Sequence, residues 1–306
     1  MKQIIILFTL LFVNINLQAQ SLRALELNDN WLKEIKDKAP EKLSFPSSQK
    51  HKVLVFSLHT GFNHWVIPFA EATMKTLVDK TGGFEMTYTK DISLLSKKNL
   101  KQYDALILNN NCSIGDKRDM FWDVFKTDSS INSLKASKKA AKYEKGLLKY
   151  VKKGGGLMTL HGGIVMQNKS AEFSEMMGGS FEYHPKQQEI EVKLVDASHP
   201  LVKAFDGKGF THMDEPYIFD KAYTKKNFKP LLYFEASEIK GLRNPDGDAI
   251  RYVSWIKTYG KGRVFYSSPS HNAQSFSNPK LLQFFLDGLQ FVVGDVDCDV
   301  SPIGTL

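Results

Sequence analysis

Short apolar runs alternate with longer amphipathic segments along the chain from residue 53 onward. The first half carries apolar runs that are typical of strands at 53–57, 105–108 and 157–160, and an alternating strand pattern at 84–89. The spacing of apolar residues, together with glycines that end a helix, predicts helices at 65–78, 118–125, 143–153 and 171–177. Strands separated by helices indicate parallel pairing, so we expect an α/β fold with a doubly wound, mainly parallel sheet.

The second half is richer in strand patterns, which fall at 189–195, 216–219, 231–234, 252–256 and 263–267. An amphipathic helix over 279–292 closes the pattern. We therefore expect one domain over 51–295 with a β-rich C-terminal elaboration, followed by a tail at 296–306. Two polar regions are assigned separately: residues 21–50 to a short helix and a linker, and residues 126–142 to a surface loop.

Residues 1–20 have the order of a secretory signal peptide, with Lys2 first, an apolar run at 4–13 and a small residue, Ala19, near the end. The run is about half of the roughly 20 residues that span a bilayer as a helix. We expect a periplasmic or secreted protein with no membrane span. An exported location permits disulfides, but the wide separation of Cys112 and Cys298 leaves their pairing open.

Composition excludes a disordered or fibrous chain, because 42% of the 306 residues are hydrophobic and 24% are charged. The net charge of +8 is concentrated in part at 135–153, which holds eight lysines. Apolar residues within this stretch, at Tyr143, Leu147, Tyr150 and Val151, follow helical spacing, which predicts an amphipathic helix with lysines on its solvent face. We therefore expect no nucleic-acid partner.

Ligands of open parallel sheets bind beyond the carboxyl ends of the strands. Four predicted strands end in polar clusters, which read "LHTGFNHW", "NNNCSIGD", "HGG" and "SPSHNAQSF". Because the fold brings such ends together, we expect the functional site at this edge of the sheet.

His161 is the first catalytic candidate, since it stands between a buried strand and Gly162-Gly163, where a constrained turn presents its side chain. Imidazole titrates near neutrality and suits proton transfer or metal binding. His271 lies in another strand-end cluster, and Asp214 or Glu215 offers a carboxylate. The catalytic candidates are His161, His271, Asp214 and Glu215. The candidate ligands of a divalent metal ion are His161, His184, His212, Asp214 and His271.

Further residues near the predicted edge are candidates for binding substrate: His64, Trp65, Asn109, Asn110, Gly162, Gly163, His184 and Asn272. Structural roles are the alternatives: a histidine that fixes a loop, acids that cap backbone amides, or a core tryptophan. Cys112 has no histidine near it in sequence and is expected to be structural. The chain has no P-loop and no G-x-G-x-x-G, so nothing supports nucleotide binding.

Several of these segments, in order from about residue 53 to 293, resemble the trehalose-utilisation (ThuA-like) family: "VLVFSLHTGFNHW", "YVKKGGGLMTLHGG", "MDEPYIF" and "GKGRVFYSSPSHNAQSF". The resemblance implies a flavodoxin-like sheet, as in class I glutamine amidotransferases. In those relatives the turn after the matching strand carries a cysteine nucleophile. Here that turn carries His161, so glutaminase chemistry is not expected.

The resemblance also implies a carbohydrate substrate, either a disaccharide or a glycoside oxidised to its 3-keto form. Acid/base cleavage or isomerisation would use His161 as base or metal ligand, His271 as its partner, and Asp214 or Glu215 as acid or ligand. A divalent metal ion could assist by polarising the ketone. A non-catalytic carbohydrate-binding protein is the alternative, and an amidotransferase or peptidase using Cys112 is a third possibility. The sugar, linkage, metal, reaction type and oligomeric state stay open.

Overall fold

The computed structural model describes residues 22–304, and the predicted signal peptide at 1–20 lies outside this range. Within it, nine strands form one sheet in the order β2-β1-β3-β4-β11-β10-β9-β6-β7. The five strands from β2 to β11 pair in parallel. Their bounds are β1 His51–Phe56, β2 Phe84–Thr89, β3 Ala105–Asn109, β4 Gly156–Leu160 and β11 Gly262–Ser267. The parallel half of the sheet is thus confirmed.

The β-rich elaboration continues the same sheet with antiparallel pairing instead of forming a separate unit. Its strands are β6 Gln188–Leu194, β7 Phe210–Asp214, β9 Lys229–Glu235 and β10 Ile250–Tyr259. A separate two-stranded sheet consists of β5 Ser180–Tyr183 and β8 Ile218–Asp220. The pattern of the sequence did not predict β5 or β7.

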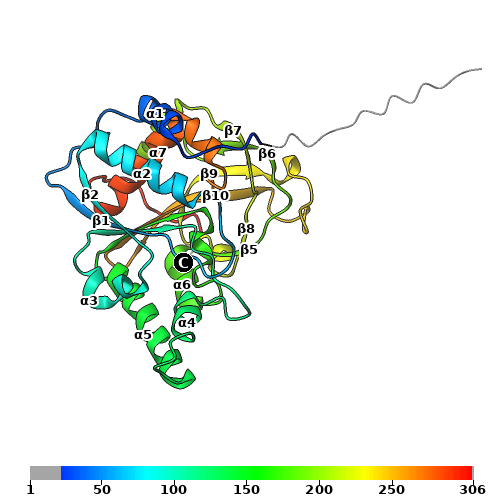
Figure 1. The fold of residues 1–306 in the computed structure, drawn as a ribbon. Helices are drawn as coiled ribbons and strands as arrows, with labels where there is room; N and C mark the ends of the chain where they lie inside the picture. Colours follow the sequence, from blue (N-terminus) through cyan, green and yellow to red (C-terminus); the bar gives the residue numbers. More distant parts are fainter. Residues whose placement is uncertain (1–21, 305–306) are drawn as a thin grey trace, which may run out of the picture.

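Helices cover both faces of the sheet (Figure 1). One group consists of α1 Asp29–Lys38, α2 Ile67–Thr81 and α7 Pro279–Val293. The other consists of α3 Lys97–Leu100, α4 Met120–Phe125, α5 Ser133–Lys152 and α6 Ala171–Met177. Short 3-10 helices complete the fold: η1 Ile92–Leu95, η2 His161–Val165, η3 Pro200–Phe205, η4 Lys221–Lys225, η5 Ala236–Glu238 and η6 Ala273–Ser277.

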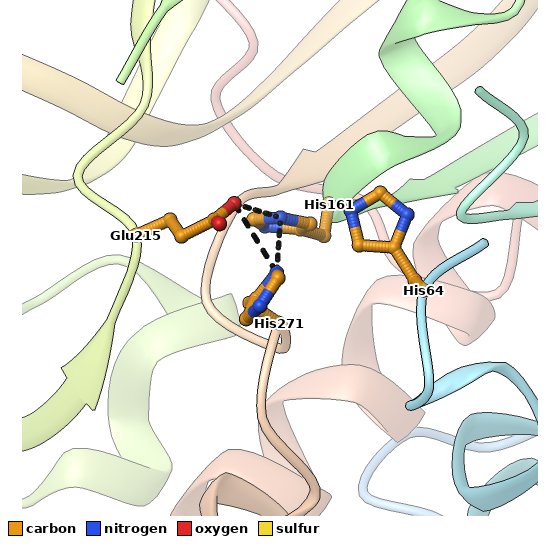
Figure 2. A group of neighbouring side chains, drawn as sticks. All are labelled: His64, His161, Glu215 and His271. Atoms are coloured by element: carbon orange, nitrogen blue, oxygen red, sulfur yellow. Dashed lines mark hydrogen bonds and ion pairs between the residues drawn. The ribbon is translucent and has the colours of Figure 1, made fainter. Parts of the chain in front are cut away.

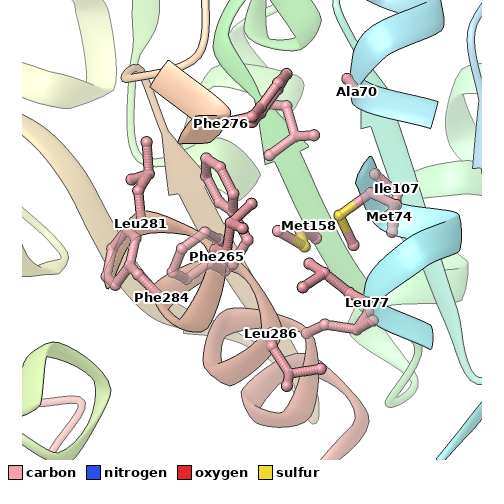
Figure 3. Close-up of a cluster of buried hydrophobic side chains, with 14 of the residues drawn as sticks. Ala70, Met74, Leu77, Ile107, Met158, Phe265, Phe276, Leu281, Phe284 and Leu286 are labelled. Atoms are coloured by element: carbon pink, nitrogen blue, oxygen red, sulfur yellow. The ribbon is translucent and has the colours of Figure 1, made fainter. Parts of the chain in front are cut away.

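The sheet therefore has a hydrophobic core on each face. Successive residues of a strand point to opposite faces, so Val53 and Val55 of β1 join one core whereas Leu54 and Phe56 join the other. Figure 3 shows part of the first core, where Met74 and Leu77 of α2 lie near Met158 of the sheet. Burial on both faces explains why β1, β3 and β4 contain continuous apolar runs, whereas β2 at the edge of the sheet alternates between apolar and polar residues.

The surface loop expected at 126–142 is wrong for most of its length, because α5 begins at Ser133. The side chain of Asn132 caps this helix by accepting a hydrogen bond from the backbone N–H of Lys135 at 2.9 Å. Ala136 and Ala140 are buried and extend the apolar stripe of the helix by one turn and more. Alanine is a weak hydrophobic signal, so the stripe was missed among the lysines.

Three further features complete the description. None of the helices in the part of the chain that the structure describes is long and apolar enough to cross a membrane.

Cys112 and Cys298 are both free thiols, which answers the open question of their pairing. The N-terminal helix expected within 21–50 is present as α1, where buried Trp31 contacts Phe69 edge-on with 5.0 Å between ring centroids.

Candidate active site

Four side chains from four separate loops converge at the carboxyl ends of the strands (Figure 2). They are His64 after β1, His161 after β4, Glu215 after β7 and His271 after β11. Each offers one nitrogen or carboxylate oxygen, and these atoms all lie within 4.8 Å of one another. Three of the four polar clusters identified in the sequence therefore supply a histidine to one site.

Sheet topology explains how Glu215 reaches the same edge. Four successive antiparallel pairings separate β11 from β7. An even number of reversals returns β7 to the direction of β11, so Glu215, which follows the last residue of β7, emerges beside the ends of the parallel strands.

The constrained turn predicted at His161 is present. His161 has a positive φ of 40°, and its side chain is fully buried. No side chain fits at Gly163, where a Cβ atom would lie 2.7 Å from the carbonyl oxygen of Leu108. Nδ1 of His161 lies 2.8 Å from the carbonyl oxygen of Ser268. A carbonyl only accepts, so Nδ1 carries the hydrogen and Nε2 presents its lone pair to the cluster.

Glu215 and His271 both lie within 3.3 Å of Nε2 of His161, the atom that carries the lone pair. Nδ1 of His271 lies 3.1 Å from Nε2 of His161. Oε2 of Glu215 lies 3.3 Å from Nε2 of His161 and 3.2 Å from Nδ1 of His271. The ring of Tyr217 lies against His161 with 4.0 Å between centroids. Tyr217 was missed in the sequence, where its place two residues after Glu215 in "DEPY" was the available signal.

Burial keeps the three histidines neutral. Desolvation lowers the pKa of His64 to about 2, of His161 to about 3 and of His271 to about 4. The neighbouring histidines lower the pKa values of His64 and His271 further, because each charged ring disfavours another. At neutral pH these imidazoles therefore offer lone pairs instead of positive charge.

Cys112 lies closer to the site than its sequence position suggested. Its Sγ atom is 3.8 Å from Nδ1 of His64 and donates to the carbonyl oxygen of Gly162 at 3.7 Å. Burial raises the pKa of the Cys112 thiol to about 12, so the sulfur stays protonated at neutral pH. A protonated thiol is a poor nucleophile, which favours the structural role over the amidotransferase or peptidase possibility.

Asp214 is adjacent to Glu215 in sequence but lies outside the cluster. Its carboxylate accepts hydrogen bonds from the backbone N–H groups of Glu215 at 2.7 Å, Ser270 at 3.1 Å and His271 at 3.4 Å. Burial raises the pKa of Asp214 to about 8, and these N–H groups oppose that shift. Asp214 thus fixes the backbone that carries Glu215 and His271.

His212 lies beside Asp214, with Nδ1 3.1 Å from Oγ of Ser275 and 3.3 Å from the carboxylate. His184 lies at the rim, where its half-buried ring places Nε2 3.6 Å from Oε1 of Glu215. Among the described residues, the cluster that could hold a metal ion includes neither His184, His212 nor Asp214. Asn272 donates its amide N–H groups to Gln187 and to the carbonyl oxygen of Met213.

The remaining substrate-binding candidates divide between core and rim. Asn109 and Asn110 are buried, and Oδ1 of Asn110 accepts from the backbone N–H of Gly162 at 3.2 Å, which fixes the turn after β4. Trp65 is 40% exposed and Phe62 is 62% exposed. Phe62 packs edge-on against His64 with 4.7 Å between centroids. Binding of substrate by these residues stays a prediction.

The chain matches the family model described as ThuA, trehalose utilisation, over residues 52–292. No curated protein matches it significantly. A ThuA-like protein from Bacteroides uniformis is 18% identical, with a TM-score of 0.59 over 81% of this chain and 93% of its own. A second, from Parabacteroides merdae, is 15% identical, with a TM-score of 0.57 over 84% and 93%. These two structures share the fold of this chain, an α/β architecture with a mixed sheet whose core strands are parallel and whose C-terminal strands are antiparallel. The family match, over most of the chain, shows that this protein belongs to the ThuA trehalose-utilisation family.

Proposed function

We propose that this protein is an exported enzyme that cleaves 3-keto glycosides or 3-keto disaccharides by acid/base elimination. The convergence of His161, His271 and Glu215 at the carboxyl edge of the sheet carries the proposal. Membership of a family described by trehalose utilisation supports a carbohydrate substrate. A site that only bound sugar would need amides and hydroxyls more than titratable groups, so the cluster favours catalysis over binding.

The chemistry requires few groups. A ketone at C3 of a sugar acidifies the hydrogen on C2, so a base can remove that proton. The electrons of the C2–H bond then form a C1=C2 double bond while the C1–O bond breaks. The leaving oxygen takes up a proton and departs as an alcohol or a second sugar. One base, one group that polarises the ketone and one proton donor are sufficient.

We assign the role of the base to His184. His184 donates from Nδ1 to the carbonyl oxygen of Pro185 at 2.8 Å, so the neutral form of the ring has its lone pair on Nε2. Its side chain is 35% exposed at the rim, where substrate can reach it. The ring stacks on Tyr217 at an interplanar angle of 21°, which fixes its orientation. We assign Glu215 and the buried histidines of the cluster to the C3 ketone of the substrate.

The test uses the purified chain with a set of 3-keto glycosides and their unoxidised parents in deuterated water. We expect alcohol release from the keto forms only, with deuterium entering C2 of unreacted substrate. Glu215→Gln and His184→Ala should slow release, whereas the control His199→Asn should not. Asparagine keeps the cap that His199 provides to η3, and the hydrogen-bond partners of His199, which are Asp299 and Leu201, are not residues of the site. Binding of keto glycosides without release or exchange would favour the carbohydrate-binding alternative.

Export is tested separately, because the N-terminal segment lies outside the described residues. The proposal expects the mature protein to begin near Gln20 or Ser21. N-terminal sequencing of protein recovered from the periplasm or medium checks this. Recovery in the cytoplasm with Met1 and Lys2 retained would contradict it.

A further inference from the structure

Three ligand atoms of the cluster form a nearly equilateral triangle. Nε2 of His161 and Nδ1 of His271 are 3.1 Å apart, and Oε2 of Glu215 lies 3.3 Å and 3.2 Å from them. They come from three different loops, which the carboxyl ends of β4, β7 and β11 bring together (Figure 2).

Too few hydrogens are available to hold this triangle together. Nε2 of His161 is an acceptor because Nδ1 donates to Ser268, and a carboxylate is an acceptor only. These two acceptors nevertheless face each other at 3.3 Å. The hydrogen on Nδ1 of His271 is the single hydrogen that His271 can direct between them. Lone pairs that converge in a buried site repel unless a cation lies among them.

The charges of the residues around Glu215 also indicate that a cation binds here. Within residues 22–304, the ion-pair partners of Glu215 are His161, His184 and His271, and no lysine or arginine. The side chain of Glu215 is only 15% exposed. A carboxylate with so little exposed surface is ordinarily paired with a positive charge or a metal ion.

We propose that Nε2 of His161, Nδ1 of His271 and Oε2 of Glu215 bind one divalent transition-metal ion of the zinc class. Ligands held about 2.0–2.2 Å from such an ion lie roughly 2.9–3.5 Å from one another for octahedral to tetrahedral angles. All three sides of the triangle fall in this range. Two imidazoles and a carboxylate suit zinc, manganese, iron or cobalt, whereas calcium and magnesium prefer all-oxygen sites.

The surroundings match those of a catalytic metal centre. Three protein ligands leave a position open for water or substrate. The Ser268 carbonyl oxygen fixes the tautomer of His161, as outer-shell partners of metal-binding histidines do. Asp214 fixes the backbone of the other two ligands. His64 contacts the rings of His161 and His271, with centroids 5.2 Å and 5.3 Å away, and lies next to the ion instead of binding it.

The role of the ion rests on the proposed function: a cation here would polarise the C3 ketone more strongly than a neutral imidazole does. Binding of the ion does not depend on any substrate and is measured first. Purified protein is stripped with chelator, loaded with zinc or cobalt(II), and desalted. We expect about one ion per chain by elemental analysis, visible absorption bands of cobalt bound to nitrogen and oxygen ligands, and a higher Tm with zinc.

Zinc binding by variants of two of the ligands and of control residues tests where the ion binds. Glu215→Gln and His271→Ala should weaken zinc binding by more than the roughly 10–100-fold that loss of an outer-shell partner costs. His64→Ala and the control His199→Asn should keep one ion per chain. Circular dichroism of each metal-free variant checks that it folds. Two outcomes would overturn the site: no ion retained by the folded protein, or an ion retained undiminished by both ligand variants.

The substrate assay separates the two proposals. Stoichiometric metal binding without cleavage of any keto glycoside would refute the proposed function and leave the metal site standing. Cleavage by protein that binds no metal would refute the metal site and leave the proposed function standing.

Discussion

The turn after β4 leaves no room for a side chain at Gly162. A Cβ atom there would lie 2.6 Å from Cε1 of His64 and 3.1 Å from Sγ of Cys112. Carbon atoms in contact are ordinarily about 3.5–4.0 Å apart, so Gly162→Ala has to displace the His64 ring by about 1 Å. Active-site side chains need to be held within about 0.5 Å of their productive positions. We therefore expect a large loss of activity in a folded protein.

The same clash has a cost in stability. Gly162 is not among the glycines with positive φ, so alanine adds the clash without backbone strain. Overpacking of this kind costs about 1–3 kcal/mol. Urea unfolding should show this loss for Gly162→Ala in the wild-type background and a smaller loss in a His64→Ala background, where the ring is gone.

The double-mutant cycle of Gly162→Ala and His64→Ala tests whether His64 is the side chain in the clash. Two side chains in contact show a coupling energy of about 0.5–3 kcal/mol. Equal costs of Gly162→Ala in both backgrounds would refute the reasoning that His64 is what excludes a side chain here.

Three further predictions concern single positions. Asp214→Ala should destabilise the chain by about 3 kcal/mol, since it leaves three buried backbone N–H groups without their acceptor; the variant should also bind zinc about 10–100-fold more weakly, and unchanged values in urea unfolding and zinc titration would contradict this. Burial raises the pKa of Asp287 from 3.8 to about 6, so its favourable contribution is complete below about pH 4 and is lost as the pH rises through 6. Asp287→Asn should accordingly be more stable than wild type by about 3 kcal/mol at pH 7.5 and by much less at pH 4, which urea unfolding at the two values checks. Gly146→Ala should stabilise α5 by about 0.5–1 kcal/mol, because the new Cβ makes only an ordinary 3.4 Å contact with Lys97; a lower Tm would contradict it.

Much of the fold was predictable because the inner parallel strands are buried on both faces. Such strands are mainly apolar and stand out between amphipathic helices, as β3 and β4 do. The strand β7, "FTHMD", has no comparable signal, because its burial varies and it lies at the edge of the sheet. The start of α5 was missed because alanines form its first buried positions.

For the site, the sequence determined which loops meet, since polar residues follow the ends of strands that must share one edge. It also determined the constrained turn at His161, through the glycines that follow. The sequence could not choose between Asp214 and Glu215, which are adjacent and chemically alike. The tertiary structure decided, because successive residues at the end of a strand point to opposite sides: Asp214 shares a side with His212, and Glu215 faces His161 and His271. Likewise, only the packing of separate loops brings Cys112 to His64, because contacts between distant segments depend on the whole fold and not on local pattern.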